Sequence, residues 1–218
     1  MLLDGKLLSK EIKKTVKEEV RKINETIKLV VVLVGDNPAS EIYVRNKQKA
    51  CQEVGIESHL LHFDDSITQE ELKSVIGSLN KEKDVYGILV QLPLPKHIAE
   101  NEIINAIDPK KDVDGFTLIN KGKLLSGVQT VHPATPQGII TLLKRNNIEI
   151  SGKHVVVIGR SNIVGKPMAL LLLKENATVT VAHSKTQNLS NLTQQADIII
   201  SAVGRQNMVT AEMVKEGA

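Results

Sequence analysis

Apolar residues recur every three or four positions along the first part of the chain, which is the spacing of one face of an α-helix. The positions that repeat are Leu8, Ile12, Val16, Val20, Ile23 and Ile27. Charged residues fill most of the places between them, so the opposite face would be exposed to water. The pattern predicts one long amphipathic helix.

Short apolar runs and stretches of helical spacing alternate in the next part of the chain. A run that is apolar throughout is typical of a parallel strand covered on both faces. Asn37 and Pro38 suit the first positions of a helix, and Gly55 suits its end. The expected elements are strand 29–34, helix 39–54, strand 56–63, helix 68–80, strand 85–90 and helix 100–107.

Turn-forming residues interrupt the alternation at 108–115 and 120–127, and a second alternating series follows. Its expected elements are helix 135–146, strand 154–158, helix 167–175, strand 178–182, helix 189–195 and strand 197–203. Alternating strands and helices predict two α/β domains with parallel sheets. We expect an N-terminal α/β domain over 1–134 and a Rossmann-like domain over 135–218.

The second series contains three strands before the sequence stops at Ala218. A dinucleotide-binding fold usually has about six strands. We therefore expect the Rossmann-like domain to be truncated at its C-terminus.

Composition narrows the class of protein. Apolar residues make up 41% and charged residues 24% of the 218 positions, which is ordinary for a globular protein. With two Tyr, two Phe and no Trp, the chain lacks the aromatic platforms that bind single-stranded nucleic acid. A net charge of +3 is weak support for any nucleic-acid partner. The charge fits an anionic small ligand as well as no charged partner at all.

Cysteine and histidine usage argues against disulfides and metals. Cys51 is the only cysteine, so no disulfide can form within the chain. His59 and His62 are three apart in a predicted strand and point to opposite faces. The N-terminus lacks the layout of a signal peptide, and no apolar run reaches membrane length. We expect a cytoplasmic protein with no metal site.

A strand, a Gly-containing turn and a helix start follow one another in Val155–Pro167. In dinucleotide folds this arrangement brings backbone N–H groups and a helix N-terminus to a pyrophosphate. Ser161 and Val164 stand where the G-x-G-x-x-G pattern has its second and third glycines. The glycine pattern alone therefore leaves an ordinary strand-to-helix turn as an equal alternative.

The end of the next strand bears on the choice of cofactor. In NAD enzymes an acid at this point accepts hydrogen bonds from the ribose hydroxyls. Here the strand is followed by His183, Ser184, Lys185 and Thr186, without a carboxylate. These side chains, together with Arg160, suit a 2′-phosphate, which favours NADP over NAD. The alternative is that His183 and Lys185 belong to a solvated loop.

Four side chains of the N-terminal domain could carry chemistry. Tyr43 and Lys47 lie one turn apart on a helix stripe that is otherwise largely apolar. Such a lysine either covers apolar surface with its stem or is desolvated and able to transfer protons. Gln91 directly follows a strand, at the sheet edge where α/β proteins bind ligands, and Asp114 lies in the loop before the second domain. Taken singly, Gln91 and Asp114 are more often ordinary loop residues.

Five motifs in one order make the pattern specific. They are Tyr43–Lys47, Val90–Pro95, Pro109–Gly115, Thr135–Gly138 and Gly159–Pro167. This order resembles the bifunctional methylenetetrahydrofolate dehydrogenase/methenyltetrahydrofolate cyclohydrolases over essentially the whole chain. A short-chain dehydrogenase also uses Tyr-x-x-x-Lys, but there the nucleotide fold precedes the motif. A shikimate-type dehydrogenase would leave the Gln91 and Asp114 segments unexplained.

The resemblance implies an enzyme of one-carbon metabolism that oxidises 5,10-methylenetetrahydrofolate with NADP. It also implies hydrolysis of the methenyl product to 10-formyltetrahydrofolate, a tetrahydrofolate interconversion that serves purine biosynthesis. In this family Lys47 would transfer protons in the hydrolysis, and Gln91 would adjust it through a hydrogen bond. Tyr43 would line the folate ring, and Asp114 would hold the pterin.

For the cofactor, the resemblance implies a cradle of backbone and side chains, and a homodimer is expected. The residues that would bind NADP are Gly159, Arg160, Ser161, Gly165, His183 and Ser184. Two departures from the family stand out: Ala134 replaces a cysteine, and a later Gly-Gly-Val-Gly-Pro segment is absent. The alternative function is therefore a non-catalytic or truncated homologue that binds nucleotide or a partner without turnover.

Overall fold

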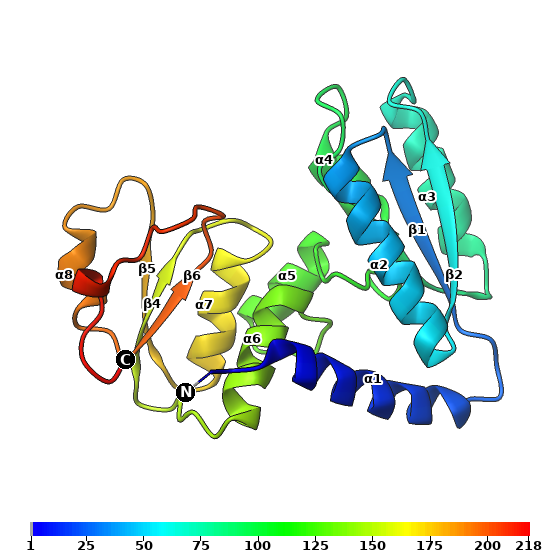
Figure 1. Ribbon diagram of the computed structural model, residues 1–218. Helices are drawn as coiled ribbons and strands as arrows, with labels where there is room; N and C mark the ends of the chain where they lie inside the picture. Colours follow the sequence, from blue (N-terminus) through cyan, green and yellow to red (C-terminus); the bar gives the residue numbers. More distant parts are fainter. Residues whose placement is uncertain (1) are drawn as a thin grey trace. The chain divides into compact units, whose positions relative to one another are not determined.

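The computed structural model describes residues 2–218, and it divides into two compact units (Figure 1). One unit is Asp4–Ile119, and the other is Asn120–Ala218 together with residues 2–3. Each unit contains a three-stranded sheet in which all neighbouring strands are parallel. The predicted fold class, two α/β domains with parallel sheets, is confirmed.

The first unit is built around one central strand. Its strands are β1 (Lys28–Val34), β2 (Glu57–Phe63) and β3 (Val85–Val90), in the order β2-β1-β3. Residues 30–34 of β1 are all buried, because helices cover both faces of the sheet. This is the environment that a continuous apolar run predicts for a parallel strand.

Four helices complete the first unit: α1 (Gly5–Arg21), α2 (Pro38–Val54), α3 (Gln69–Lys81) and α4 (Glu100–Ala106). Helices α3 and α4 pack on one face of the sheet, where Leu72, Ile76 and Ile103 are fully buried. Helix α2 covers the other face through Val44. Because α2 lies on the sheet, its polar positions can meet the carboxyl end of β3.

Local signals in the sequence set the ends of these helices. The Asn37 side chain accepts hydrogen bonds from the N–H groups of Ala39 and Ser40, and Pro38 is the first residue of α2. Gly55 ends α2 in the left-handed conformation with φ of 88°, which glycine adopts without steric cost. The predicted start and end of this helix are confirmed.

The second unit repeats the arrangement around β4. Its strands are β4 (His154–Ile158), β5 (Thr178–Ala182) and β6 (Ile198–Ser201), in the order β5-β4-β6. Its helical segments are α6 (Ala134–Arg145), α7 (Gly165–Lys174), α8 (Leu189–Thr193) and the short 3₁₀ turn η1 (Ala211–Met213). Helices α6 and α7 bury Ile140 and Met168 against one face of β4, and Ala196 packs on the other. Helix α5 (Leu118–Leu125) connects the two units along the chain.

Two predictions about elements were wrong. The first helix ends at Arg21, because the N–H groups of Lys22 and Ile23 bond back to carbonyls three residues earlier. Ile23 and Ile27 therefore lie outside it. The region 120–127, predicted as turns, lies largely within α5, because Leu124 is buried with the core residues of α6 and α7 and this packing outweighs the weak propensity of Gly122.

Among the helices of residues 2–218, none combines the length and the apolar character that a membrane span requires.

Candidate active site

A lysine and a glutamine meet at the carboxyl end of β3. Helix α2 holds Lys47, and its Nζ donates a hydrogen bond to Gln91 Oε1 at 3.1 Å. Gln91 Nε2 donates to the Leu92 carbonyl oxygen at 2.7 Å, which fixes the amide with its oxygen toward the lysine. The Gln91 backbone N–H donates to Val32 O at 2.9 Å and extends the sheet by one residue. The hydrogen bond between Lys47 and Gln91 therefore depends on the backbone of α2 and of the end of β3, and the fold holds both in place.

Asp114 belongs to the same cluster of charges. Burial raises the pKa of its carboxyl group above the ordinary value. The positive charge of Lys47 acts against that rise, and the negative charge of Asp112 adds to it. The structure thus brings Lys47, Gln91 and Asp114 together, although they come from a helix, a strand end and a loop.

Tyr43 and Cys51 flank Lys47 at one-turn spacing along α2. The Tyr43 side chain is 62% exposed, so its ring is available to cover an apolar, flat ligand. Cys51 is partly buried, and this burial raises the pKa of its thiol, while the nearby charge of Lys47 acts to lower it. The helix stripe predicted from the sequence is therefore present, with the ammonium group directed at Gln91.

The turn after β4 is compact enough to require glycine at two positions. Gly159 has φ of 125°, and a Cβ there would lie 2.6 Å from the Ala202 carbonyl oxygen. A Cβ on Gly165, the first residue of α7, would overlap the Gly159 carbonyl group. Gly159, the one glycine that remains from the G-x-G-x-x-G pattern, and Gly165, one residue beyond its third position, thus allow helix and strand to approach closely, a role that glycine has in dinucleotide folds.

Ser161 has a structural role that the sequence did not reveal. Its Oγ accepts hydrogen bonds from the backbone N–H groups of Val164 at 3.1 Å and Gly165 at 3.3 Å. The hydroxyl therefore bonds the backbone N–H groups at the start of α7 and so closes the turn, and its own O–H remains a donor toward a ligand. Arg160 and Ser161 are both exposed.

The chain turns sharply after β5. The His183 N–H donates to Thr186 Oγ1 at 2.8 Å, and His183 Nδ1 accepts from the Lys185 N–H at 3.2 Å. Because Nδ1 is an acceptor, the neutral ring carries its proton on Nε2. Ser184 and Lys185 are exposed beside it. This group of donors contains the residues predicted to favour a 2′-phosphate.

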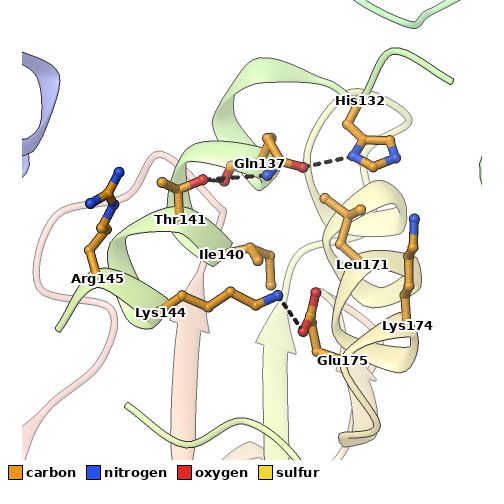
Figure 2. A pocket seen from close by; sticks show the side chains of 9 residues that line it. All are labelled: His132, Gln137, Ile140, Thr141, Lys144, Arg145, Leu171, Lys174 and Glu175. Atoms are coloured by element: carbon orange, nitrogen blue, oxygen red, sulfur yellow. Dashed lines mark hydrogen bonds and ion pairs between the residues drawn. The ribbon is translucent and has the colours of Figure 1, made fainter. Parts of the chain in front are cut away.

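A separate hollow of about 360 Å³ lies between α6 and α7 (Figure 2). The lining residues are His132, Gln137, Ile140, Thr141, Lys144, Arg145, Leu171, Lys174 and Glu175. An ion pair of 2.6 Å joins Lys144 to Glu175, and a hydrogen bond of 2.7 Å joins His132 to Gln137 (Figure 2). None of the site residues predicted from the sequence lines this hollow, and its polar pairs tie α6 to its neighbours.

The fold, the cluster of Lys47, Gln91 and Asp114, and the group of donors after β4 and β5 define the class of protein. It is an α/β protein with one unit of nucleotide-binding type and a second unit that carries a lysine hydrogen-bonded to a glutamine. Residues 3–114 match the family model for the catalytic domain of tetrahydrofolate dehydrogenase/cyclohydrolase. Residues 133–218 match the model for the NAD(P)-binding domain of the same family. The chain belongs to the tetrahydrofolate dehydrogenase/cyclohydrolase family.

Relatives support this assignment along the whole chain. The bifunctional protein FolD of Bacillus cytotoxicus is 54% identical over all of this chain and 77% of its own length. The crystal structure of the FolD enzyme from Campylobacter jejuni is 50% identical, with a TM-score of 0.96 over 99% of this chain and 78% of that one. A Trypanosoma brucei FolD, solved with NADP cofactor and an inhibitor, is 35% identical, with a TM-score of 0.93 over 99% of this chain and 75% of that one.

Proposed function

We propose that this chain oxidises 5,10-methylenetetrahydrofolate to the 5,10-methenyl form with NADP and hydrolyses the product to 10-formyltetrahydrofolate. The observation that carries the proposal is the Lys47–Gln91 hydrogen bond beside the partly buried Asp114, within a chain of this family. A homologue that bound nucleotide without turnover would have no need of this arrangement. The reaction belongs to one-carbon metabolism and supplies a formyl donor for purine biosynthesis.

The residues present fit NADP. The tight packing of Gly159 against Gly165 sets the course of the turn into the ten-residue helix α7, and the N-terminus of such a helix favours an anionic group such as a pyrophosphate. Arg160 and Ser161 offer exposed donors at this turn, and Ser184 offers another after β5. The segment after β5, residues 183–188, contains no carboxylate that would repel a 2′-phosphate. When bound, NADP supplies the hydride acceptor.

The first step depends on how the substrate is held. Under this proposal the Asp114 carboxylate accepts hydrogen bonds from the pterin, and the exposed Tyr43 ring covers the folate. Loss of hydride from the bridging methylene leaves a methenyl cation. Positioning accounts for much of the rate. Reactants that are already bound and oriented have lost their translational and rotational freedom before the reaction, whereas free reactants would lose it during the reaction.

The second step needs proton transfer, for which Lys47 is placed. The unprotonated amine form of Lys47 takes a proton from the water molecule as that water adds to the methenyl carbon. The bond from that carbon to N5 then breaks as N5 gains a proton and the hydroxyl oxygen loses one, which leaves the formyl group on N10. Gln91 Oε1 accepts from Nζ at 3.1 Å and so directs the amine toward the reacting atoms.

We also propose functional boundaries, an assembly and a location. The catalytic, folate-binding region is 1–134, and the NADP-binding region is 135–218. The active form is a homodimer, as expected from the family resemblance. The free thiol of Cys51 suits the reducing cytoplasm, where we place the reaction.

The proposal is tested by assaying the purified chain with methylenetetrahydrofolate and either NADP or NAD. We expect turnover with NADP and release of 10-formyltetrahydrofolate. In Lys47→Met the hydrolysis of methenyltetrahydrofolate should be lost, because no amine remains to transfer the proton. Unchanged hydrolysis would remove the role assigned to this lysine.

The cofactor assignment has its own test. Arg160→Ala should weaken binding of NADP much more than binding of NAD, because only NADP carries the 2′-phosphate that a guanidinium can bind. Isothermal titration with each dinucleotide measures the two affinities. An equal loss for both would overturn the assignment.

A further inference from the structure

The loop that carries Asp114 is held from inside by a second carboxylate. The Asp112 residue is only 2% exposed. Its Oδ2 accepts a hydrogen bond from the Thr117 N–H at 2.8 Å, and its Oδ1 accepts one from the Phe116 N–H at 3.2 Å. Asp114 lies within the span of chain that these two bonds close.

The same loop is anchored to the sheet and to α3. The Ile88 N–H in β3 donates to the Lys111 carbonyl oxygen at 2.8 Å, so the loop continues the parallel sheet for one residue. Lys111 Nζ donates to the carbonyl oxygens of Leu79 at 3.0 Å and Glu82 at 2.6 Å, at the end of α3. The start of the loop is therefore fixed on two sides.

Gly87 in β3 makes the room that the loop needs. A Cβ at this position would lie 2.5 Å from Val113 Cγ1 and 3.0 Å from Leu29 Cδ1. Val113 separates Asp112 from Asp114 and packs against the apolar face of the sheet that includes Leu29. A side chain at position 87 would push Val113 outward, and its two neighbours in the chain would move with it.

We propose that Asp112 and Gly87 are positioning residues that fix Asp114 for folate binding, an inference that rests on the role proposed for Asp114. Asp112 acts by closing the loop around Asp114, and Gly87 acts by letting Val113 lie flat on β3. A buried carboxylate bonded to two N–H groups holds backbone more firmly than a neutral acceptor does, because charge-assisted hydrogen bonds are roughly twice as strong.

Asp112→Asn is the first test. The amide keeps one acceptor but turns a donor toward one of the two N–H groups, so the loop loses a hydrogen bond. We expect kcat/KM for methylenetetrahydrofolate to fall by up to about 100-fold, the size of effect that a small misplacement of a binding group produces. The KM for NADP should not change.

A double-mutant cycle separates this proposal from the proposed function. If Asp112 acts through Asp114, then Asp112→Asn should add little folate defect to a chain that already carries Asp114→Asn. Additive losses would overturn the positioning role. A normal folate KM in Asp114→Asn alone would instead overturn the role of Asp114 in the proposed function.

The pH profile gives a readout that a purely structural role would not move. The charges that act on Asp114 are those of Lys47, which lowers its pKa, and Asp112, which raises it. Folate KM should rise as the pH falls and Asp114 takes up a proton. Removing the Asp112 charge should move this rise to lower pH, and an unshifted profile would count against the proposal.

Gly87 provides an independent variant with a built-in rescue. Gly87→Ala should lower kcat/KM for the folate, and adding Val113→Ala should restore much of it, because Val113 Cγ1 is then absent. Thr68→Ala is the matched control, since it removes the N-cap of α3 in the same unit at a cost of about 1 kcal/mol. If the control impairs folate binding as much as Gly87→Ala does, or if the rescue fails, the proposal is wrong.

Discussion

At the scale of single residues, surroundings decide what a side chain can do. The sequence left two interpretations of Lys47 open, a stem covering apolar surface or an ammonium held for chemistry. In the structure the residue is partly buried and its Nζ meets Gln91 at 3.1 Å. That contact joins residues 44 apart in the chain, so no local pattern could have revealed it. The role of Asp112 was missed for a different reason: it accepts hydrogen bonds from the backbone N–H groups of Phe116 and Thr117, and a backbone group carries no residue identity in the sequence.

Asp114 gives a prediction about stability and pH. Its pKa is higher in the folded protein than in the unfolded chain, so its ionised form opposes folding at neutral pH. Below about pH 4 the carboxyl is protonated in both states, and that cost disappears. Asp114→Asn should therefore raise the Tm at pH 7, with a gain that fades as the pH falls toward 4.

Thermal unfolding followed by circular dichroism across this range measures the effect. Glu18→Gln is a suitable control, because Glu18 is exposed in α1 of the same unit. A Tm gain for Asp114→Asn that does not depend on pH would contradict the electrostatic explanation.

At the scale of elements, the sequence predicted a cap or a turn well where the local backbone geometry favours one type of residue. Asn37 and Gly55 bound α2 as expected, because an N-cap and a left-handed C-terminal residue are local requirements. Helix α5 was not predicted, because it depends on burying Leu124 against residues that come later in the chain. The nucleotide turn lies between these cases. The sequence indicated Gly159 and Gly165, but it did not indicate the two hydrogen bonds that the Ser161 hydroxyl accepts.

The turn gives a prediction with an internal control. Gly165→Ala places a methyl group against the Gly159 carbonyl and should displace the turn, lowering the Tm and weakening NADP binding at least tenfold. Gly122→Ala, in α5, adds a methyl with no atom within 4 Å and should stabilise the helix by about 1 kcal/mol. Titration calorimetry and thermal unfolding distinguish the two outcomes. Equal NADP affinity in both variants would contradict the packing argument.

At the scale of the whole molecule, the chain is two units that each have their own sheet and core. The cofactor assigned above should then stabilise the unit that binds it more than the other. At a free NADP concentration 100 times its Kd, the free energy needed to open the NADP-binding unit should rise by about 2.7 kcal/mol. Hydrogen exchange should slow in β4 and the following turn far more than in β1. Equal slowing in both strands would contradict this prediction.

The sequence by itself determined the alternating strands and helices, the caps of α2, the glycines of the nucleotide turn and the order of motifs that indicated the family. These features are readable because each follows from local backbone geometry or from residues close together in the chain. Only the tertiary structure decided that Lys47 faces Gln91, that Asp112 closes the loop around Asp114 and that Gly87 makes room for Val113. The physical reason is that the contacts of Lys47 and Gly87 join a helix, a strand and a loop, which only the parallel sheet brings together. The bonds of Asp112 lie within one loop, but they go to backbone N–H groups, which are the same in every non-proline residue.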